Sequence, residues 1–357
     1  MPARWRIVAA YAAVAAANQL LWLTYAPITT DTAEHFGVSE SAVGWLTQVF
    51  PLLYVLLAIP AGRALDRAFR PALLTGAWVT VLGGLVRLGD TYALALIGQI
   101  LVAIAQPLIL NAVTKVAASA LPERQRANGI ALGTAGIFAG TALALPLGPA
   151  LADAESLMPL LVVDAVFALA AAVALSVTLR PAEATRSPVR LAQFRIVWRL
   201  AAVAFLGFGV FVALTTWLQA LLEPAGISDT TAGGLLAAMV VAGVASSALL
   251  PPRLVKHHQE RVFLRAAAIV AAIGCITLAL APHAAIAAVI PLGIVLLGAL
   301  PILLELTERR SAPAALIWLA GNTGGIVVAV IVQALSDRPG AAFGVMAAVA
   351  LSVLVFA

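Results

Sequence analysis

The stretch Gly62-Arg63-Ala64-Leu65-Asp66-Arg67-Ala68-Phe69-Arg70-Pro71 is a short, strongly charged segment between two long apolar runs. These runs, residues 42–62 and 71–89, are as long as the ~20 apolar residues that cross a bilayer as a helix. In lipid such a run has to be helical, because every backbone N–H and C=O needs a partner within its own segment. The stretch therefore predicts a tight polar turn between two membrane-spanning helices.

The same alternation of apolar run and short polar turn continues along the whole chain. The other runs cover residues 6–27, 92–115, 128–151, 157–179, 197–222, 230–250, 264–281, 284–305, 313–335 and 340–357. The composition agrees, since 63% of the residues are hydrophobic and only 10% are charged, against about a quarter in a soluble domain. The sequence predicts an all-α integral membrane protein with twelve transmembrane helices.

The basic residues give the orientation of these helices. If the N-terminus is cytoplasmic and twelve helices alternate, 19 of the 21 Lys and Arg residues fall on the cytoplasmic side. Only Arg87 and Arg338 fall outside. This asymmetry is the one that the positive-inside rule describes. Arginine also outnumbers lysine 19 to 2, which is typical of a GC-rich bacterial genome, so we expect a multi-pass protein of the bacterial inner membrane.

Several classes of function are not expected. The sequence pI near 10 does not indicate a nucleic-acid partner, because the basic residues are spread over short loops. His257 and His258 lack a third ligand residue nearby, so we expect no metal and no cofactor. The chain has no clustered nucleophile and base, which argues against an enzyme. A receptor would need a sizeable domain outside the membrane.

Two cytoplasmic loops resemble signatures of the major facilitator superfamily. Gly62, Asp66, Arg67 and Arg70 match its loop signature G-x-x-x-D-R-x-G-R-R, whereas Phe69 and Pro71 depart from it. The segment Pro122-Glu123-Arg124-Gln125-Arg126-Ala127-Asn128-Gly129 resembles the P-E-x-R-x-x-A-x-G connection before the fifth helix. The resemblance implies a transporter with two pseudo-symmetric six-helix halves, which is the major facilitator fold.

The longest polar stretch, from Arg180 to Gln193, lies at the midpoint of the twelve runs. We therefore predict an N-terminal half over 1–179, a cytoplasmic linker over 180–196 and a C-terminal half over 197–357. Halves of this kind are parallel repeats that enclose the substrate site near the membrane midplane.

The cytoplasmic loops also predict a latch that biases one conformation against another. A carboxylate at a helix end can pair with basic residues or with a helix N-terminus. Glu305 and Glu308 lie close to Arg309 and Arg310, and we expect them to form a gate or salt-bridge cluster. Lys115 either pairs with these glutamates or reaches the interface. The candidate latch residues are Asp66, Arg67, Arg70, Lys115, Arg126, Glu305 and Glu308.

Four further motifs lie within the apolar runs, namely Asn18-Gln19-Leu20-Leu21-Trp22-Leu23-Thr24-Tyr25, Ala105-Gln106-Pro107, Leu300-Pro301 with Glu305, and Gly324-Gly325. They give the chain a similarity to the feline leukaemia virus receptor-related transporters, whose members handle choline, ethanolamine, haem or vitamin-like amines. It implies an aromatic and amide pocket around a cationic head group.

The resemblance places Trp22 and Asn322 in this pocket. Val212 stands where the branch has an aromatic residue, so Trp217 or Trp318 is expected to supply another wall. Asn18, Trp22 and Tyr25 share one face of a helix, where they either line a cavity or pack helices together. The candidate substrate-binding residues are Trp22, Asn18, Tyr25, Gln106, Asn322, Trp217 and Trp318.

Asp164 lies within the sixth apolar run, where a charge costs at least ~2.5 kcal/mol. It is either paired with a polar neighbour or a proton-coupling site. The leading hypothesis is a monomeric transporter that moves a small organic amine or quaternary ammonium compound across the bilayer by facilitated diffusion. A proton-coupled exporter of drugs or metabolites, and a haem transporter, are the alternatives.

Overall fold

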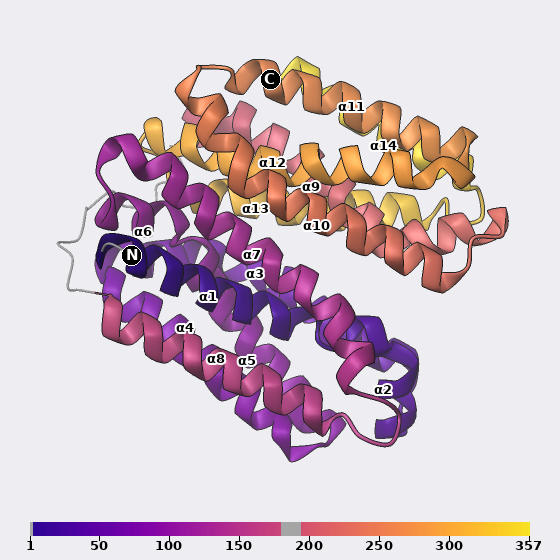
Figure 1. The fold of residues 1–357 in the computed structure, drawn as a ribbon, viewed down its shortest axis with the longest axis horizontal. Helices are drawn as coiled ribbons and strands as arrows, with labels where there is room; N and C mark the ends of the chain where they lie inside the picture. The colour runs from indigo at the N-terminus through magenta and orange to yellow at the C-terminus, as the bar shows by residue number, and fades with distance from the viewer. Residues whose placement is uncertain (1–2, 180–193) are drawn as a thin grey trace. The chain divides into compact units, whose positions relative to one another are not determined.

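The computed structural model describes residues 3–179 and 194–357, so most of the predicted linker, residues 180–193, lies outside the described residues. The chain divides into two compact units, Met1–Val189 and Arg190–Ala357. Among the described residues there are fourteen α-helices and no β-strand. Figure 1 shows both units as sets of long helices joined by short turns.

The N-terminal unit is built around its first helix. Its helices are α1 (Ala3–Leu23), α2 (Thr29–Phe36), α3 (Glu40–Arg67), α4 (Phe69–Val86), α5 (Tyr92–Leu110), α6 (Val113–Ala120), α7 (Glu123–Leu151) and α8 (Met158–Thr178). Two short 3-10 turns, η1 (Ala26–Ile28) and η2 (Arg87–Gly89), follow α1 and α4. Helix α1 packs against α7, α8 and α5, which explains why most of its side chains are buried.

The pair α1 and α7 is packed backbone to backbone. A Cβ atom added at Gly136 would lie 2.6 Å from the carbonyl oxygen of Ala12, and one added at Gly140 would collide with the carbonyl oxygen of Ala16. Small residues let helices approach this closely within a membrane, where van der Waals packing largely drives association. The glycines of α7 therefore set the distance between the two helices.

Glycines also allow close backbone packing of helices in the C-terminal unit. Its helices are α9 (Phe194–Leu222), α10 (Asp229–Lys256), α11 (Glu260–Leu280), α12 (Ala285–Arg309), α13 (Ala314–Gln333) and α14 (Pro339–Ser352). Gly293 of α12 meets the backbone of Met239 on α10, and Gly324 of α13 meets the backbone of Phe205 on α9. Two tightly packed helix pairs, α10 with α12 and α9 with α13, form the body of this unit.

The helices of the described residues have the length and surface of membrane spans. Eleven of them are long and apolar enough to cross a membrane, and the apolar segment Pro339–Val355 is a shorter twelfth. Large apolar side chains lie on the outside of the bundles, including Leu56, Val177 and Leu280, which are 70%, 80% and 81% exposed. Such surfaces suit a hydrocarbon solvent.

The structure differs from the predicted runs in three places. The run 92–115 is broken at Asn111-Ala112 into α5 and α6, and the segment after η1 forms the short helix α2. Helix α9 begins at Phe194, inside the predicted linker. Hydropathy finds apolar stretches and overlooks short polar helices such as α2, and it overlooks bends that hydrogen bonds stabilise.

Candidate functional site

Trp22 is held firmly near the end of α1. Its indole N–H donates to the carbonyl of Thr47 on α3 at 3.0 Å. Its ring stacks on Phe50, with the ring centroids 5.8 Å apart and the planes 30° apart. Phe50 is fully buried, whereas Trp22 is only partly buried. The structure thus provides a fixed aromatic pair with one accessible member.

Asn18, one turn before Trp22, is fully buried within the N-terminal unit. Its amide nitrogen donates to Thr80 Oγ1 at 3.2 Å and to the carbonyl of Val102 at 3.1 Å. The amide of Gln19 donates to Asn18 Oδ1 at 3.2 Å. These bonds link α1 with α4 and α5, so the geometry favours packing over a cavity for Asn18.

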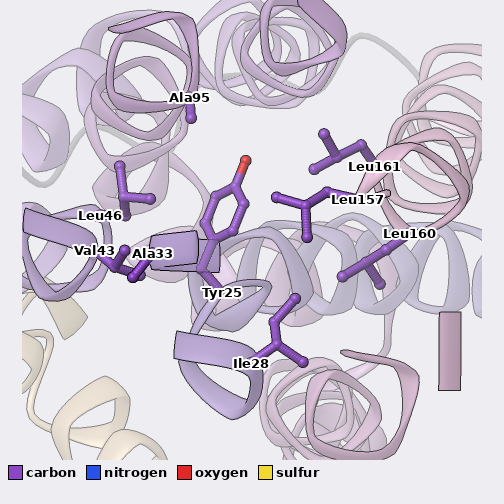
Figure 2. Packing of buried hydrophobic residues seen from close by; sticks show 9 residues of the cluster. All are labelled: Tyr25, Ile28, Ala33, Val43, Leu46, Ala95, Leu157, Leu160 and Leu161. Atoms are coloured by element: carbon purple, nitrogen blue, oxygen red, sulfur yellow. The ribbon is translucent and has the colours of Figure 1, made fainter. Parts of the chain in front are cut away.

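Tyr25 lies in an apolar cluster at the end of the N-terminal unit that holds α2. Figure 2 shows its ring surrounded by aliphatic side chains from several elements. The cluster consists of Tyr25, Ile28, Ala33, Val43, Leu46, Ala95, Leu157, Leu160 and Leu161. The ring is completely buried, and the guanidinium carbon of Arg87 lies 5.7 Å from its centroid. Tyr25 is therefore a packing residue that also faces a buried cation.

Asp164 on α8 and Arg87 in η2 form a completely buried ion pair. Arg87 donates to Asp164 Oδ2 at 3.0 Å and to the carbonyl of Leu21 at 3.2 Å. The hydroxyl of Thr24 donates to the same carboxylate oxygen at 2.5 Å and accepts from Arg87 at 3.1 Å. Of the two roles considered for Asp164, the structure shows pairing with polar neighbours. The network fastens α8 and the end of α4 to α1.

Sequence reasoning missed Arg87 as an intramembrane charge. It assigned this residue to the outer loop, although Arg87 is 0% exposed. A signal was present in the sequence, since Arg87 is one of only two basic residues that violate the positive-inside asymmetry. Arg87 lies near the end of one apolar run, and Asp164 is an acid inside another. Such a combination indicates an ion pair.

The predicted latch residues of the N-terminal unit lie at the ends of α3, α4, α6 and α7. Lys115 of α6 pairs with the Asp66 carboxylate of α3, which corrects the expectation that it would pair with Glu305 and Glu308 or reach the interface. Arg70 donates to the carbonyl of Leu179 at 3.0 Å. Arg67 is exposed, and Arg126 is partly buried on α7.

We expect the ion pair between Lys115 and Asp66 to show energetic coupling. Lys115→Gln and Asp66→Asn should each lower the melting temperature, and the double variant should lose less than the sum, with a coupling energy of about 0.5–3 kcal/mol. Thermal unfolding of the detergent-solubilised protein measures this. Arg67→Gln is the control, because its exposed side chain should contribute within about 0.5 kcal/mol. Strictly additive losses would contradict the pairing.

The break between α5 and α6 is stabilised by side-chain hydrogen bonds. Asn111 accepts from the Tyr54 hydroxyl at 2.7 Å and donates to the carbonyl of Ala58 at 2.9 Å. Both partners lie on α3. Gln106, predicted to bind substrate, is buried on α5 one residue before Pro107.

In the C-terminal unit the structure separates the two predicted tryptophans. Trp318 of α13 is buried with its ring edge-on to Phe208 at 6.2 Å, and Asn322 donates to the Trp318 carbonyl at 2.9 Å. Trp217 donates to the carbonyl of Ala329, eleven residues further along α13. A separation of eleven helical residues corresponds to about 16 Å. Trp318 and Asn322 are therefore neighbours, and Trp217 lies apart from them.

Arg309 organises the predicted acidic cluster of the C-terminal unit. It donates to Glu305 at 3.2 Å within α12 and to Glu260 at 3.0 Å at the start of α11. Glu308 is partly buried on the same helix. Sequence reasoning missed Glu260, the first residue of α11, whose carboxylate accepts from Arg309. Across the described ranges, no group of three or more His, Cys, Asp or Glu side chains is arranged to hold a metal.

One protein-family model matches most of the chain. The family model described as Major Facilitator Superfamily matches residues 7–315. The chain belongs to the Major Facilitator Superfamily. The predictions of a membrane transporter and against an enzyme are thereby confirmed.

Relatives within this superfamily include the predicted branch. Solute carrier family 49 member A3 of Danio rerio is 30% identical over 259 residues, which cover 64% of this chain and 54% of that protein. The Homo sapiens choline/ethanolamine transporter FLVCR2 is 29% identical over 119 residues, 32% of this chain and 23% of that protein. The resemblance to the feline leukaemia virus receptor-related branch is confirmed. This major facilitator chain spans about half the length of the Solute carrier family 49 relatives.

Solved major facilitator structures confirm the twelve-helix fold. The human organic anion transporter MFSD10 (TETRAN) superposes with a TM-score of 0.80 at 15% identity, covering all of both chains. The transporter FucP in the outward conformation superposes with a TM-score of 0.78 at 18% identity, covering 100% of this chain and 98% of that one. At such identities the similarity concerns the fold alone.

Proposed function

We propose that this major facilitator protein carries a small organic amine or quaternary ammonium compound by alternating access and facilitated diffusion. The observation that carries the proposal is the Trp22–Phe50 pair, in which a partly buried indole is fixed by its bond to Thr47. The face of an indole attracts an ammonium group by about 0.5–2 kcal/mol. The related transporters whose names specify choline and ethanolamine support the same substrate class.

The charge of one end of the N-terminal unit also supports a cationic substrate. An acidic face, formed by α2, the start of α3, the α4–α5 turn and the α7–α8 connection, carries six carboxylates. They belong to Asp31, Glu34, Glu40, Asp90, Asp153 and Glu155. Arg87, the one Lys or Arg of these segments, is buried against Asp164. Under the predicted orientation this face is external, where its potential would concentrate organic cations.

Facilitated diffusion is proposed because Asp164 already has a counter-ion. A transported proton would compete with Arg87 and Thr24 for the same carboxylate. Latches at the cytoplasmic ends, built from Lys115 with Asp66 and from Arg309 with Glu260 and Glu305, are proposed to bias the conformational equilibrium.

Uptake of labelled choline and ethanolamine into proteoliposomes tests the proposal. Trp22→Ala should raise the half-saturating concentration by about 3- to 30-fold, because it removes the cation–π contact. Trp45→Ala is the matched control, since Trp45 lies on α3 and is 53% exposed.

A pH gradient separates the competing functions. Saturable uptake that is independent of the pH gradient supports facilitated diffusion. Flux that follows the gradient, and loses this dependence in Asp164→Asn, would indicate the proton-coupled exporter instead. No uptake of either amine, with haem transported, would overturn the substrate class.

A further inference from the structure

His35 makes two contacts that together require an extra proton. Its Nδ1 lies 3.1 Å from the carbonyl oxygen of Ala154, and its Nε2 lies 2.9 Å from Asp90 Oδ1. A backbone carbonyl and a carboxylate both only accept hydrogen bonds. A neutral imidazole has one N–H, so it can satisfy only one of them. Both bonds form together only when the ring carries two protons and a positive charge.

The two contacts join three separate segments of the N-terminal unit. His35 is on α2, Asp90 is in the α4–α5 turn and Ala154 is in the α7–α8 connection. The His35 side chain is 13% exposed and that of Asp90 is 35% exposed, so solvent reaches the pair. Asp90 is fixed in a left-handed conformation, with φ of 53°, and its N–H donates to the carbonyl of Arg87.

The surroundings favour a cation at this position. The nearest Lys or Arg in these segments, Arg87, is committed to Asp164. The other titratable groups on the elements around His35 are Asp31 and Glu34 on α2, Glu40 at the start of α3, Tyr92 on α5, and Asp153 and Glu155 beside Ala154. All five carboxylates among them attract a positive imidazolium. An imidazole changes charge near neutral pH, which makes it a natural sensor of that range.

We propose that His35, Asp90 and the carbonyl of Ala154 form a proton-binding site that clasps α2 to the α4–α5 turn and the α7–α8 connection. When the proton leaves, one of the two bonds is lost and α2 is released. Because only the short turn η1 joins α2 to α1, the site links the proton concentration on the acidic face to the mobility of the helix that carries Trp22. This inference does not depend on the identity of the transported solute.

Amide hydrogen exchange of residues 29–36 at pH 5.5 and pH 8.0, corrected for the intrinsic rate, tests the clasp in the full-length protein. A hydrogen bond to a charged group contributes roughly a tenfold to hundredfold change in an opening equilibrium. Protection of α2 should therefore fall at least tenfold at pH 8.0, while protection of α8 stays the same. Protection of α2 that is equal at both values would overturn the proposal.

Two variants make the test specific. Asp90→Asn replaces an acceptor by a group that can donate, so a neutral His35 can then satisfy both partners. Asparagine also tolerates the left-handed backbone. This variant should keep α2 protected at both pH values, whereas His35→Ala should leave it unprotected at both. A pH-dependent Asp90→Asn protein would contradict the two-proton requirement, even if His35→Ala failed to fold.

Discussion

Replacing either partner of the buried Arg87–Asp164 pair should unfold the N-terminal unit well below the wild-type melting temperature. Arg87→Ala leaves the carboxylate of Asp164 with only Thr24 as a hydrogen-bond donor, and Asp164→Ala leaves a guanidinium in an apolar site. Removing one member of a buried ion pair costs about 3–5 kcal/mol. Thermal unfolding of the purified protein in detergent should show a loss of this size for each variant.

The double variant distinguishes an unpaired charge from lost packing. Arg87→Met with Asp164→Leu removes both charges and keeps apolar volume, so it should recover most of the stability, as buried pairs replaced by apolar residues often do. Arg338→Ala is the control, because this arginine is exposed in the C-terminal unit. If the double variant were as unstable as the sum of the single ones, the charges would not be paired in the folded state.

Adding a single methyl group at Gly140 should separate α1 from α7. The new Cβ would collide with the backbone carbonyl of Ala16, and a backbone cannot move aside as a flexible side chain can. Overpacking of this kind costs typically 1–3 kcal/mol. Gly140→Ala should therefore lower the melting temperature, and it should weaken uptake because α1 also carries Trp22.

Gly44→Ala on α3 is the matched control for this substitution. A Cβ atom at Gly44 meets nothing within 4 Å. In an open helical position, alanine is more favourable than glycine by roughly 0.5–1 kcal/mol. The two variants carry the same chemical change and should shift the melting temperature in opposite directions. Equal shifts would mean that the α1–α7 contact is looser than the structure shows.

Much of the fold was predictable from the sequence, because in lipid a run of apolar residues has to be a helix. The hairpin between residues 281 and 285, the turn at Ala68 and the break before α7 all lie where charge or proline interrupts hydropathy. The bend at Asn111 was not predictable in this way. It depends on Tyr54 and Ala58, which are more than fifty residues distant in the sequence.

The candidate site was less predictable than the fold. The spacing predicts one helix face for Asn18, Trp22 and Tyr25, but α1 ends at Leu23 and Tyr25 lies beyond it. Each of the three side chains also faces a different environment. Periodicity gives the direction of a side chain but does not identify its partner. The pairings of Asp164 with Arg87, of Lys115 with Asp66 and of Arg309 with Glu260 could not be predicted for the same reason, since each joins two different elements.

The bend between α5 and α6 has an energetic consequence. Pro107 removes one backbone N–H from the end of α5, and the chain then turns through Asn111, whose side chain bonds to α3. Two neutral hydrogen bonds contribute about 1–3 kcal/mol in net terms. A ligand shifts such an equilibrium only by the difference between its binding free energies for the two forms. A roughly tenfold to hundredfold preference for a straightened fourth span would therefore match the free energy that these two hydrogen bonds contribute to the bend.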